Sequence, residues 1–297
     1  MPWLQINVTT SPDNAEQYED LLLAAGCAAV TFEDAKDQPI FEPELGTTPL
    51  WSVTTITGLF SAEYDLEQTL TLLNNAKSEL SDAKAQFKAE ILEDKDWERE
   101  WMSHYHPMQF GDHFWVCPSW IEVPDPGAVN LMLDPGLAFG TGTHPTTALC
   151  LEWLASQDMS NKTVIDYGCG SGILGIAAKL LGASEVTGVD IDPQALQATK
   201  DNLVRNELEV DSLPVYFPEQ LEPHEVDIVI ANILAGPLKD LAPHLARLVK
   251  TQGQIVLSGL LSEQAESLLA TYQEWFDMEA VSYKEDWIRL SGTKRPS

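Results

Sequence analysis

The sequence predicts an α/β protein in which a doubly wound sheet follows a smaller α+β domain. From Thr163 onward, short apolar and β-branched runs alternate with helical segments, which is typical of a parallel sheet with helices on both faces. The first part of the chain has the order β-α-β-β-α-β, which predicts a ferredoxin-like arrangement. We expect this domain at residues 1–95, a connector helix and short strands at 96–120, and the doubly wound domain at 121–297; the 297-residue chain is long enough for both.

The elements of the first domain follow from hydrophobic spacing. Residues 3–8 alternate apolar and polar side chains, and 51–60 is rich in β-branched residues, so both are predicted strands. The first helix has Ser11 as a candidate N-cap and Gly26 just past its end. The full prediction is strands at 3–8, 28–34, 51–60 and 85–92, with helices at 13–25 and 65–80.

The connector is rich in tryptophan and histidine. Trp97 and Trp101 lie four residues apart in a dense charge run, which favours a solvated helix whose tryptophans cover a neighbouring core. His104, His106 and His113 suggest a metal site, but no acidic or cysteine residue stands at ligand spacing. We therefore expect aromatic packing between short strands here, and no metal.

The second domain is predicted as alternating strands and helices. A glycine-rich loop leads into its first helix, with Thr143 as candidate N-cap and Pro145 near the first helical position. The loop lacks the Gly-Lys-Ser/Thr ending of a P-loop, although its backbone N–H groups could hold an anion. Later strands are expected within 162–168, 184–191, 226–232 and 253–259, and later helices at 175–181, 193–206 and 235–249.

The composition excludes several classes of partner. With 46 acidic and 17 basic residues the net charge is −29, so phosphate backbones and anionic membranes repel the chain, and we expect neither nucleic-acid nor membrane binding. A basic protein would be attracted, although solubility or salt adaptation explains the charge equally well. The amino terminus lacks the pattern of a signal peptide, and the four cysteines lack CxxC spacing, which favours a reducing cytoplasm.

A glycine motif carries the strongest chemical signal. A buried strand runs into the triplet Gly168, Gly170 and Gly172, and the next strand finishes at Asp190. Glycines let the backbone approach a ligand closely, and an acidic residue at the tip of the second strand can bind both ribose hydroxyls. Ile173 stands where a dinucleotide motif needs its third glycine, which favours a nucleoside cofactor without pyrophosphate. The alternative is a tight turn without a ligand.

Two other residues stand where a doubly wound sheet places its chemistry. Asn232 ends a predicted strand at its carboxyl end, where reacting groups lie, although a simple turn residue is an equal alternative. Cys169 lies between two motif glycines and has no basic neighbour to lower its thiol pKa. We interpret Cys169 as a packing residue.

At these residues the chain resembles class I S-adenosylmethionine-dependent methyltransferases, and within them the ribosomal protein L11 methyltransferase (PrmA) family. VIDYGCGSG and VTGVDID match the general class, whereas LDPGLAFGTGTHPTT followed by NILAGPL carries the narrower match, and the likeness extends over nearly the whole chain. The resemblance implies a seven-stranded methyltransferase sheet and an amino-terminal domain that captures the substrate protein. It also implies methylation of α-amino and lysine ε-amino groups of ribosomal protein L11.

The resemblance also assigns site residues. It implies that the cofactor contacts are Thr147, Gly168, Asp190 and Asn232, with Phe139 and Gly170 as additional neighbours. We further expect Asn232, with the backbone carbonyls of Ile233 and Leu234, to orient the acceptor nitrogen. The sequence identifies no general base.

Three other functions are weighed against this one. A nicotinamide-dependent dehydrogenase is disfavoured by Ile173, and a non-catalytic ribosomal interaction module is disfavoured by the intact glycine motif. The third alternative is a methyltransferase that acts on small molecules or nucleic acids. We expect a monomer that docks a basic ribosomal protein, because residues 1–60 hold nine acidic side chains and one basic, although the acidity of the whole chain accounts for most of this excess.

Overall fold

The computed structural model describes residues 3–36, 38, 40, 47–61, 66–92, 105–134 and 142–296. The chain divides into two compact units, residues 1–104 and 105–297, each with its own hydrophobic core. Trp97, Trp101, His104 and Phe139 lie outside the described residues. No helix in the described part of the chain is long and apolar enough to cross a membrane.

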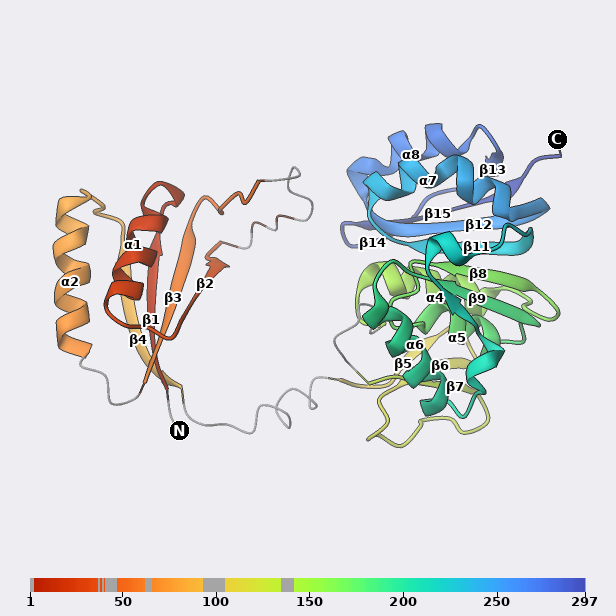
Figure 1. The fold of residues 1–297 in the computed structure, drawn as a ribbon, viewed down its shortest axis with the longest axis horizontal. Coiled ribbons are helices and arrows are strands. Elements are labelled where there is room, and N and C mark those ends of the chain that lie inside the picture. The colour runs from red at the N-terminus through yellow and green to blue at the C-terminus, as the bar shows by residue number, and fades with distance from the viewer. Residues whose placement is uncertain are drawn as a thin grey trace. The chain divides into compact units, whose positions relative to one another are not determined.

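The first unit is a four-stranded antiparallel sheet with two helices (Figure 1). Its strand order is β2-β3-β1-β4, which confirms the ferredoxin-like prediction. β3 begins three residues later than predicted, and Ser11 precedes α1 without a side-chain capping bond. The elements are β1 (Trp3–Thr10), α1 (Pro12–Ala24), β2 (Ala29–Asp34), β3 (Thr54–Ser61), α2 (Leu66–Glu79) and β4 (Gln86–Leu92).

A buried carboxylate ties β1 to the turn before β4. Asp82 accepts a hydrogen bond from the Thr10 hydroxyl at 2.5 Å and one from the Ala85 N–H at 3.1 Å. Burial raises the pKa of this carboxyl, but hydrogen bonds from Thr10, from Asn14 and from the backbone outweigh it, so the pKa lies below its ordinary value of 3.8. The ionised form of Asp82 therefore stabilises the first unit.

The second unit contains one large sheet. Its main path has seven strands in the order β10-β9-β8-β11-β12-β15-β13, and β14 adds an eighth beside β15. The elements on this sheet are α4 (Pro145–Ser156), β8 (Thr163–Tyr167), α5 (Ile173–Leu180), β9 (Glu185–Val189), α6 (Pro193–Arg205), η1 (Val210–Ser212), β10 (Val215–Tyr216), η2 (Pro218–Gln220), β11 (Val226–Asn232), α7 (Ala235–Leu248), β12 (Val249–Leu261), η3 (Ser262–Gln264), α8 (Ala265–Tyr272), β13 (Phe276–Met278), β14 (Ser282–Lys284) and β15 (Trp287–Lys294).

The seven-stranded, doubly wound prediction is confirmed, with one correction. Strands β8 to β12 are parallel as expected, but β15 runs antiparallel to β12, and β13 and β14 run antiparallel to β15. The correction has a local cause, because β13, β14 and β15 follow one another through short turns that leave no room for a crossover helix. The strand order reverses between β8 and β11, and ligands bind at such switch points.

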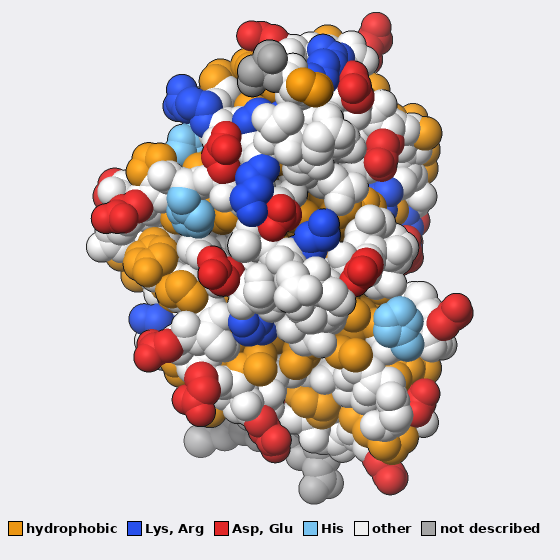
Figure 2. Space-filling view, turned by 90° about the vertical axis from the view of Figure 1, so that its right-hand side faces the viewer, with side chains coloured by type: hydrophobic (Ala, Val, Ile, Leu, Met, Phe, Trp, Pro, Cys, Tyr) orange, Lys and Arg blue, Asp and Glu red, His pale blue; other side chains and the backbone are white. Residues whose placement is uncertain are grey.

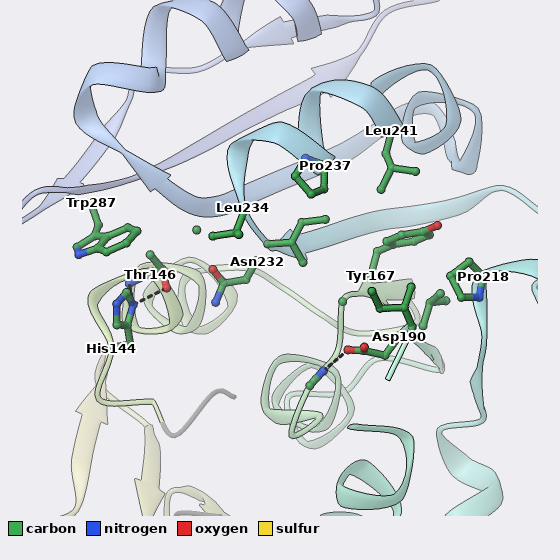
Figure 3. A pocket seen from close by; sticks show the side chains of 16 residues that line it. His144, Thr146, Tyr167, Asp190, Pro218, Asn232, Leu234, Pro237, Leu241 and Trp287 are labelled. Atoms are coloured by element: carbon green, nitrogen blue, oxygen red, sulfur yellow. Dashed lines mark hydrogen bonds between the residues drawn. The ribbon is translucent and has the colours of Figure 1, made fainter. Parts of the chain in front are cut away.

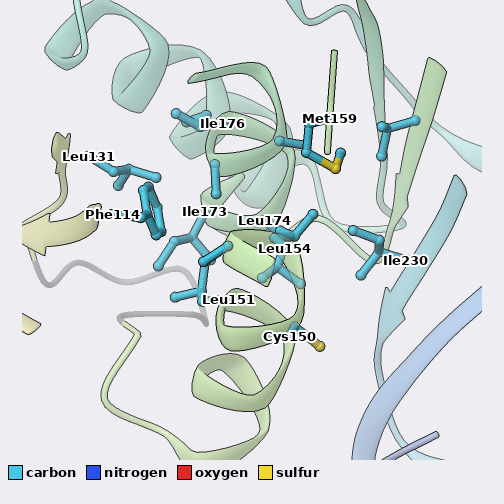
Figure 4. Packing of buried hydrophobic residues seen from close by; sticks show 14 of the residues in the cluster. Phe114, Leu131, Cys150, Leu151, Leu154, Met159, Ile173, Leu174, Ile176 and Ile230 are labelled. Carbon is cyan, nitrogen blue, oxygen red and sulfur yellow. The ribbon is translucent and has the colours of Figure 1, made fainter. Parts of the chain in front are cut away.

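Helices cover both faces of this sheet (Figure 1). Within β8, Val164 packs into the core beneath α4 and α5, and Ile165 packs into the core with α7 and α8. Figure 4 shows part of the first core, in which Leu151, Leu154, Ile173 and Ile230 come together. Burial on both faces explains why these strands read as continuous apolar runs.

A smaller three-stranded sheet contains the described part of the predicted connector. It consists of β5 (Met108–Phe110), β6 (Phe114–Cys117) and β7 (Val129–Met132). Phe114 and Leu131 from this sheet belong to the core shown in Figure 4. Residues 105–120 therefore pack as part of the second unit.

We expect Asp82→Ala to destabilise the first unit by about 2 kcal/mol, since Thr10 and the Ala85 N–H lose a buried partner. The folded-state pKa is lowered, so this contribution is complete above pH 3.8 and disappears as pH falls through the folded-state value. Hydrogen exchange of the β1 amides, compared between the unaltered protein and Asp82→Ala from above pH 3.8 downward, measures this difference in stability. A difference that grows on acidification would contradict the assignment.

Candidate functional site

The turn after β8 is built from glycines in conformations that other residues rarely adopt. Gly168 has φ +82° and Gly172 has φ +78°. A Cβ on Gly168 would lie 2.2 Å from the side chain of Ile233, and one on Gly172 would lie 2.6 Å from Thr199. The glycines are therefore required by backbone geometry and by the close packing of neighbouring elements.

Asp166 anchors the helix that follows this turn. Its Oδ2 accepts the Gly175 N–H at 2.8 Å, which satisfies one of the free N–H groups in the first turn of α5. Burial raises the pKa of Asp166 to about 7; the Gly175 bond opposes this shift and the charge of Asp190 adds to it. Because strand and helix are tied together here, the glycine turn between them has a fixed shape.

Asp190 stands at the end of β9, in the position that the sequence predicted. Its Oδ2 accepts the Gly170 N–H at 2.9 Å, and its Oδ1 accepts the Asp192 N–H at 3.0 Å. Each carboxylate oxygen can accept more than one hydrogen bond, so the group can also bind two hydroxyls. The backbone thus holds Asp190 in one orientation for a ligand.

These elements surround a pocket of about 520 Å³ at the carboxyl ends of β8, β9 and β11 (Figure 3). The predicted site residues Gly168, Gly170, Asp190 and Asn232 all line it. Thr147 does not line it: its side chain is fully buried, and its hydroxyl accepts a hydrogen bond from Asn232 Nδ2 at 3.2 Å. Thr147 therefore reaches the pocket through Asn232.

Asn232 presents an unsatisfied acceptor. While Nδ2 bonds Thr147, the Oδ1 atom is buried and has no hydrogen-bond partner among the described residues. An orphaned buried acceptor costs about 1–3 kcal/mol, which a ligand with an N–H or O–H donor would recover. The position of Asn232 beside the pocket fits such a ligand.

The turn after β11 is clamped between two glycines. Ile233 packs against Gly168 on one side, and its carbonyl oxygen faces Gly259 on the other, where a Cβ would lie only 2.3 Å away. Gly259 has φ +83° and lies where the β12–β15 register shifts, between Leu257 and Leu260. Irregularities of this kind commonly occur beside active sites, and this one makes room for the turn that carries Asn232.

The structure adds pocket residues that sequence reasoning missed. His144, and not Thr143, is the N-cap of α4: its side chain accepts the Thr146 N–H at 3.3 Å. Histidine ranks below threonine as a cap, which made Thr143 the better choice from sequence. Trp287 also lines the pocket, although it lies far along the chain and outside any recognisable motif.

The thiol of Cys169, beside the pocket, is buried. Burial raises the pKa of the Cys169 thiol well above its usual range, with the charge of Asp166 adding to the effect. Its Sγ accepts a hydrogen bond from the Thr199 hydroxyl at 3.6 Å. These contacts agree with the interpretation of Cys169 as a packing residue.

The site fits a nucleoside with a reactive group beyond its sugar. Asp190 can bind the sugar hydroxyls, and Gly168 leaves room that a Cβ would fill. Asn232 offers its free acceptor farther along the same wall. The arrangement can therefore hold a donor and a second, hydrogen-bonding reactant side by side.

Comparisons with known proteins agree with this geometry. The family model described as "Ribosomal protein L11 methyltransferase (PrmA)" matches residues 2–295. The chain is 57% identical over 294 residues to the ribosomal protein L11 methyltransferase of Marinomonas sp., covering 99% of each chain. It is 58% identical over 295 residues to that of Teredinibacter turnerae, covering 99% of this chain and 98% of the relative.

A solved structure shows the same fold. The ribosomal protein L11 methylase of Lactobacillus delbrueckii subsp. bulgaricus superposes with a TM-score of 0.58 at 28% identity, over 65% of this chain and 100% of that one. The family predicted from the glycine, HPTT and NILAG motifs is therefore confirmed. The chain belongs to the ribosomal protein L11 methyltransferase family.

Proposed function

We propose that this pocket holds S-adenosylmethionine and that the chain transfers its methyl group to α-amino and lysine ε-amino groups of ribosomal protein L11. Methylation of L11 with this donor follows from the family. The observation that supports the assignment to this pocket is that Asp190 and the orphaned Asn232 Oδ1 share one wall at the switch point of the sheet. Incubation with the donor and L11, followed by mass spectrometry of L11 peptides, tests the proposal.

The predicted site residues would act either by contacting the donor or by positioning another side chain. Asp190 would bind the ribose, and Gly168 and Gly170 would let the backbone approach the donor. Thr147 would act by holding the Asn232 amide, since their side chains are hydrogen bonded. Phe139 keeps the role that the family motif implies, as a neighbour of the donor.

The donor's sulfonium supplies an activated methyl group, so the protein has to present a neutral amine in line with it. A lysine is almost wholly protonated at pH 7, and desolvation beside a cation lowers its pKa. Asn232 Oδ1 would accept an N–H of this amine and so direct its lone pair. Positioning then contributes most of the catalysis.

The carbonyls of Ile233 and Leu234, which we expected from the sequence to help orient the acceptor, have contacts within the chain. The Leu234 carbonyl already accepts the Leu238 N–H at 3.1 Å, and the Ile233 carbonyl packs against Gly259. Among the pocket-lining residues that the structure describes, Asp190 is the only carboxylate. We therefore expect the amine proton to leave through solvent, without a dedicated carboxylate base.

Recognition of L11 would fall to the first unit. Its exposed α1 face carries Asp13, Glu16 and Asp20, which would attract a basic protein.

On the face shown in Figure 2, lysine and arginine side chains are interspersed with acidic ones, which does not favour a phosphate backbone. We expect a cytoplasmic monomer that acts on the protein and not on RNA.

Replacing Asp190 with Ala should weaken S-adenosylmethionine binding roughly ten- to a hundred-fold, because hydrogen bonds to a charged group contribute about 1.5–3 kcal/mol. Calorimetry measures the affinity. Asp201→Ala is the matched control, since Asp201 is exposed on α6 outside the pocket lining and accepts a hydrogen bond from Gln197. Equal affinities in both variants would place the ribose elsewhere.

Gly168→Ala should lower donor affinity about ten-fold or more, since the new methyl group would collide with Ile233 at a positive φ. Gly236→Ala is its control, because nothing lies within 4 Å of the Cβ position there. Titration of both variants with the donor makes the comparison. Unchanged binding by Gly168→Ala would mean that this turn does not cradle the donor.

A protein lacking residues 1–104 should still bind the donor, because the cores of the second unit lie entirely beyond residue 104. Without the first unit it should lose methylation of intact L11. Circular dichroism checks that the shortened protein folds, and calorimetry measures its affinity for the donor. Mass spectrometry of L11 measures how much methylated product it forms. Methylation of L11 at the full rate would rule out the recruitment role.

A further inference from the structure

The pocket has two ends, and the proposed function uses only one of them fully. In Figure 3, Asp190 and Pro218 lie toward one end, His144 and Trp287 lie toward the other, and Asn232 lies between. The donor's ribose occupies the Asp190 end in our proposal. The end formed by His144 and Trp287 faces the position where an acceptor would reach Asn232.

Strand direction brings Trp287 to this edge of the sheet. It is the first residue of β15, which runs antiparallel to β12 and pairs Trp287 with Leu261, the last residue of β12. An antiparallel strand thus begins at the edge where the parallel strands end. His144 arrives from the N-cap of α4, and the two rings meet edge to face, with centroids 4.7 Å apart and planes at 70°.

Hydrogen bonds fix the histidine ring, and burial favours its neutral form. Its Nδ1 lies 2.7 Å from the Thr146 hydroxyl and accepts the Thr146 N–H. Burial lowers the pKa of His144, and the charge of Glu285 only partly opposes this. A neutral imidazole behind the indole adds no positive charge that would repel a cation.

The surroundings suit an alkylammonium group. Aromatic faces, tryptophan above all, attract ammonium cations without accepting their proton. Leu234 supplies apolar surface beside Asn232, where a methylene chain can lie. Among the described residues that line the pocket, none at this end is a carboxylate, and Glu285, whose charge acts on His144, lies outside the lining. The methylated product is again a cation, so the same wall suits substrate and product.

We propose that Trp287, braced by His144, is a specificity-determining residue whose indole receives the alkylammonium group of the acceptor and of its methylated product. This inference rests on the proposed function, which makes the acceptor an amine. It goes further in naming the wall that selects a flexible, cationic side chain.

A binding experiment separates charge recognition from simple packing. In protein labelled with ¹⁵N-tryptophan and saturated with S-adenosylhomocysteine, the Trp287 indole signal is assigned from Trp287→Phe. A peptide containing trimethyllysine should shift this signal and bind roughly five- to thirty-fold more tightly than the peptide with its neutral carbon isostere, which is the range of a desolvated cation–π contact. Equal binding of the two peptides, or no shift at Trp287, would overturn the proposal.

Kinetics with L11 provide the second test. Trp287→Leu should raise the KM for L11 roughly five- to thirty-fold with donor affinity within two-fold, and Trp287→Phe should restore part of the loss. Tyr283→Leu is the control, because Tyr283 is exposed on β14 and outside the pocket. An unchanged KM in Trp287→Leu, or a lost donor affinity, would contradict the assignment. Failure of the unaltered protein to methylate L11 would instead reject the proposed function, while the peptide titration still decides the role of Trp287.

Discussion

The contact between Gly168 and Ile233 determines where the pocket forms. Gly168 follows β8 and Ile233 follows β11, the two adjacent parallel strands between which the strand order reverses. Only a residue without Cβ allows the turns after these strands to approach so closely, and Gly259 permits the same on the other side of Ile233. Asp190, after β9, and Asn232, at the end of β11, are thereby held along one wall of the pocket.

Sequence reasoning recovered the parts of the molecule that depend on local pattern. Alternation and glycine turns gave the element order of both domains, and residues next to strand ends, such as Asp190 and Asn232, were found because parallel strands share one edge. The antiparallel direction of β15 was missed, since an apolar strand reads alike in both directions. Trp287 was also missed as a pocket residue. Its position beside His144 results from long-range strand pairing, which no local spacing in the sequence indicates. Thr147 was predicted as a cofactor contact, but the structure places its side chain outside the pocket lining, where its hydroxyl accepts a hydrogen bond from Asn232.

The charge of the pocket contrasts with that of the chain. The protein has a net charge of −29, yet Asp190 is the only acidic residue among the described residues that line the pocket. A carboxylate beside the acceptor would hold a lysine as its ammonium ion and so remove the nucleophile. A pocket of amide and aromatic groups can attract the amine and still leave its proton free to depart. The acidity of the chain thus remains available for attracting a basic protein without interfering with the chemistry.

We propose that Asn232 directs the acceptor nitrogen toward a donor whose ribose is bound by Asp190. A crystal structure of the protein with S-adenosylhomocysteine and L11 measures this directly. We expect both ribose hydroxyls to donate hydrogen bonds to the Asp190 carboxylate and the acceptor nitrogen to lie within hydrogen-bond distance of Asn232 Oδ1. An acceptor nitrogen that approaches the sulfur without contacting Asn232 would contradict it.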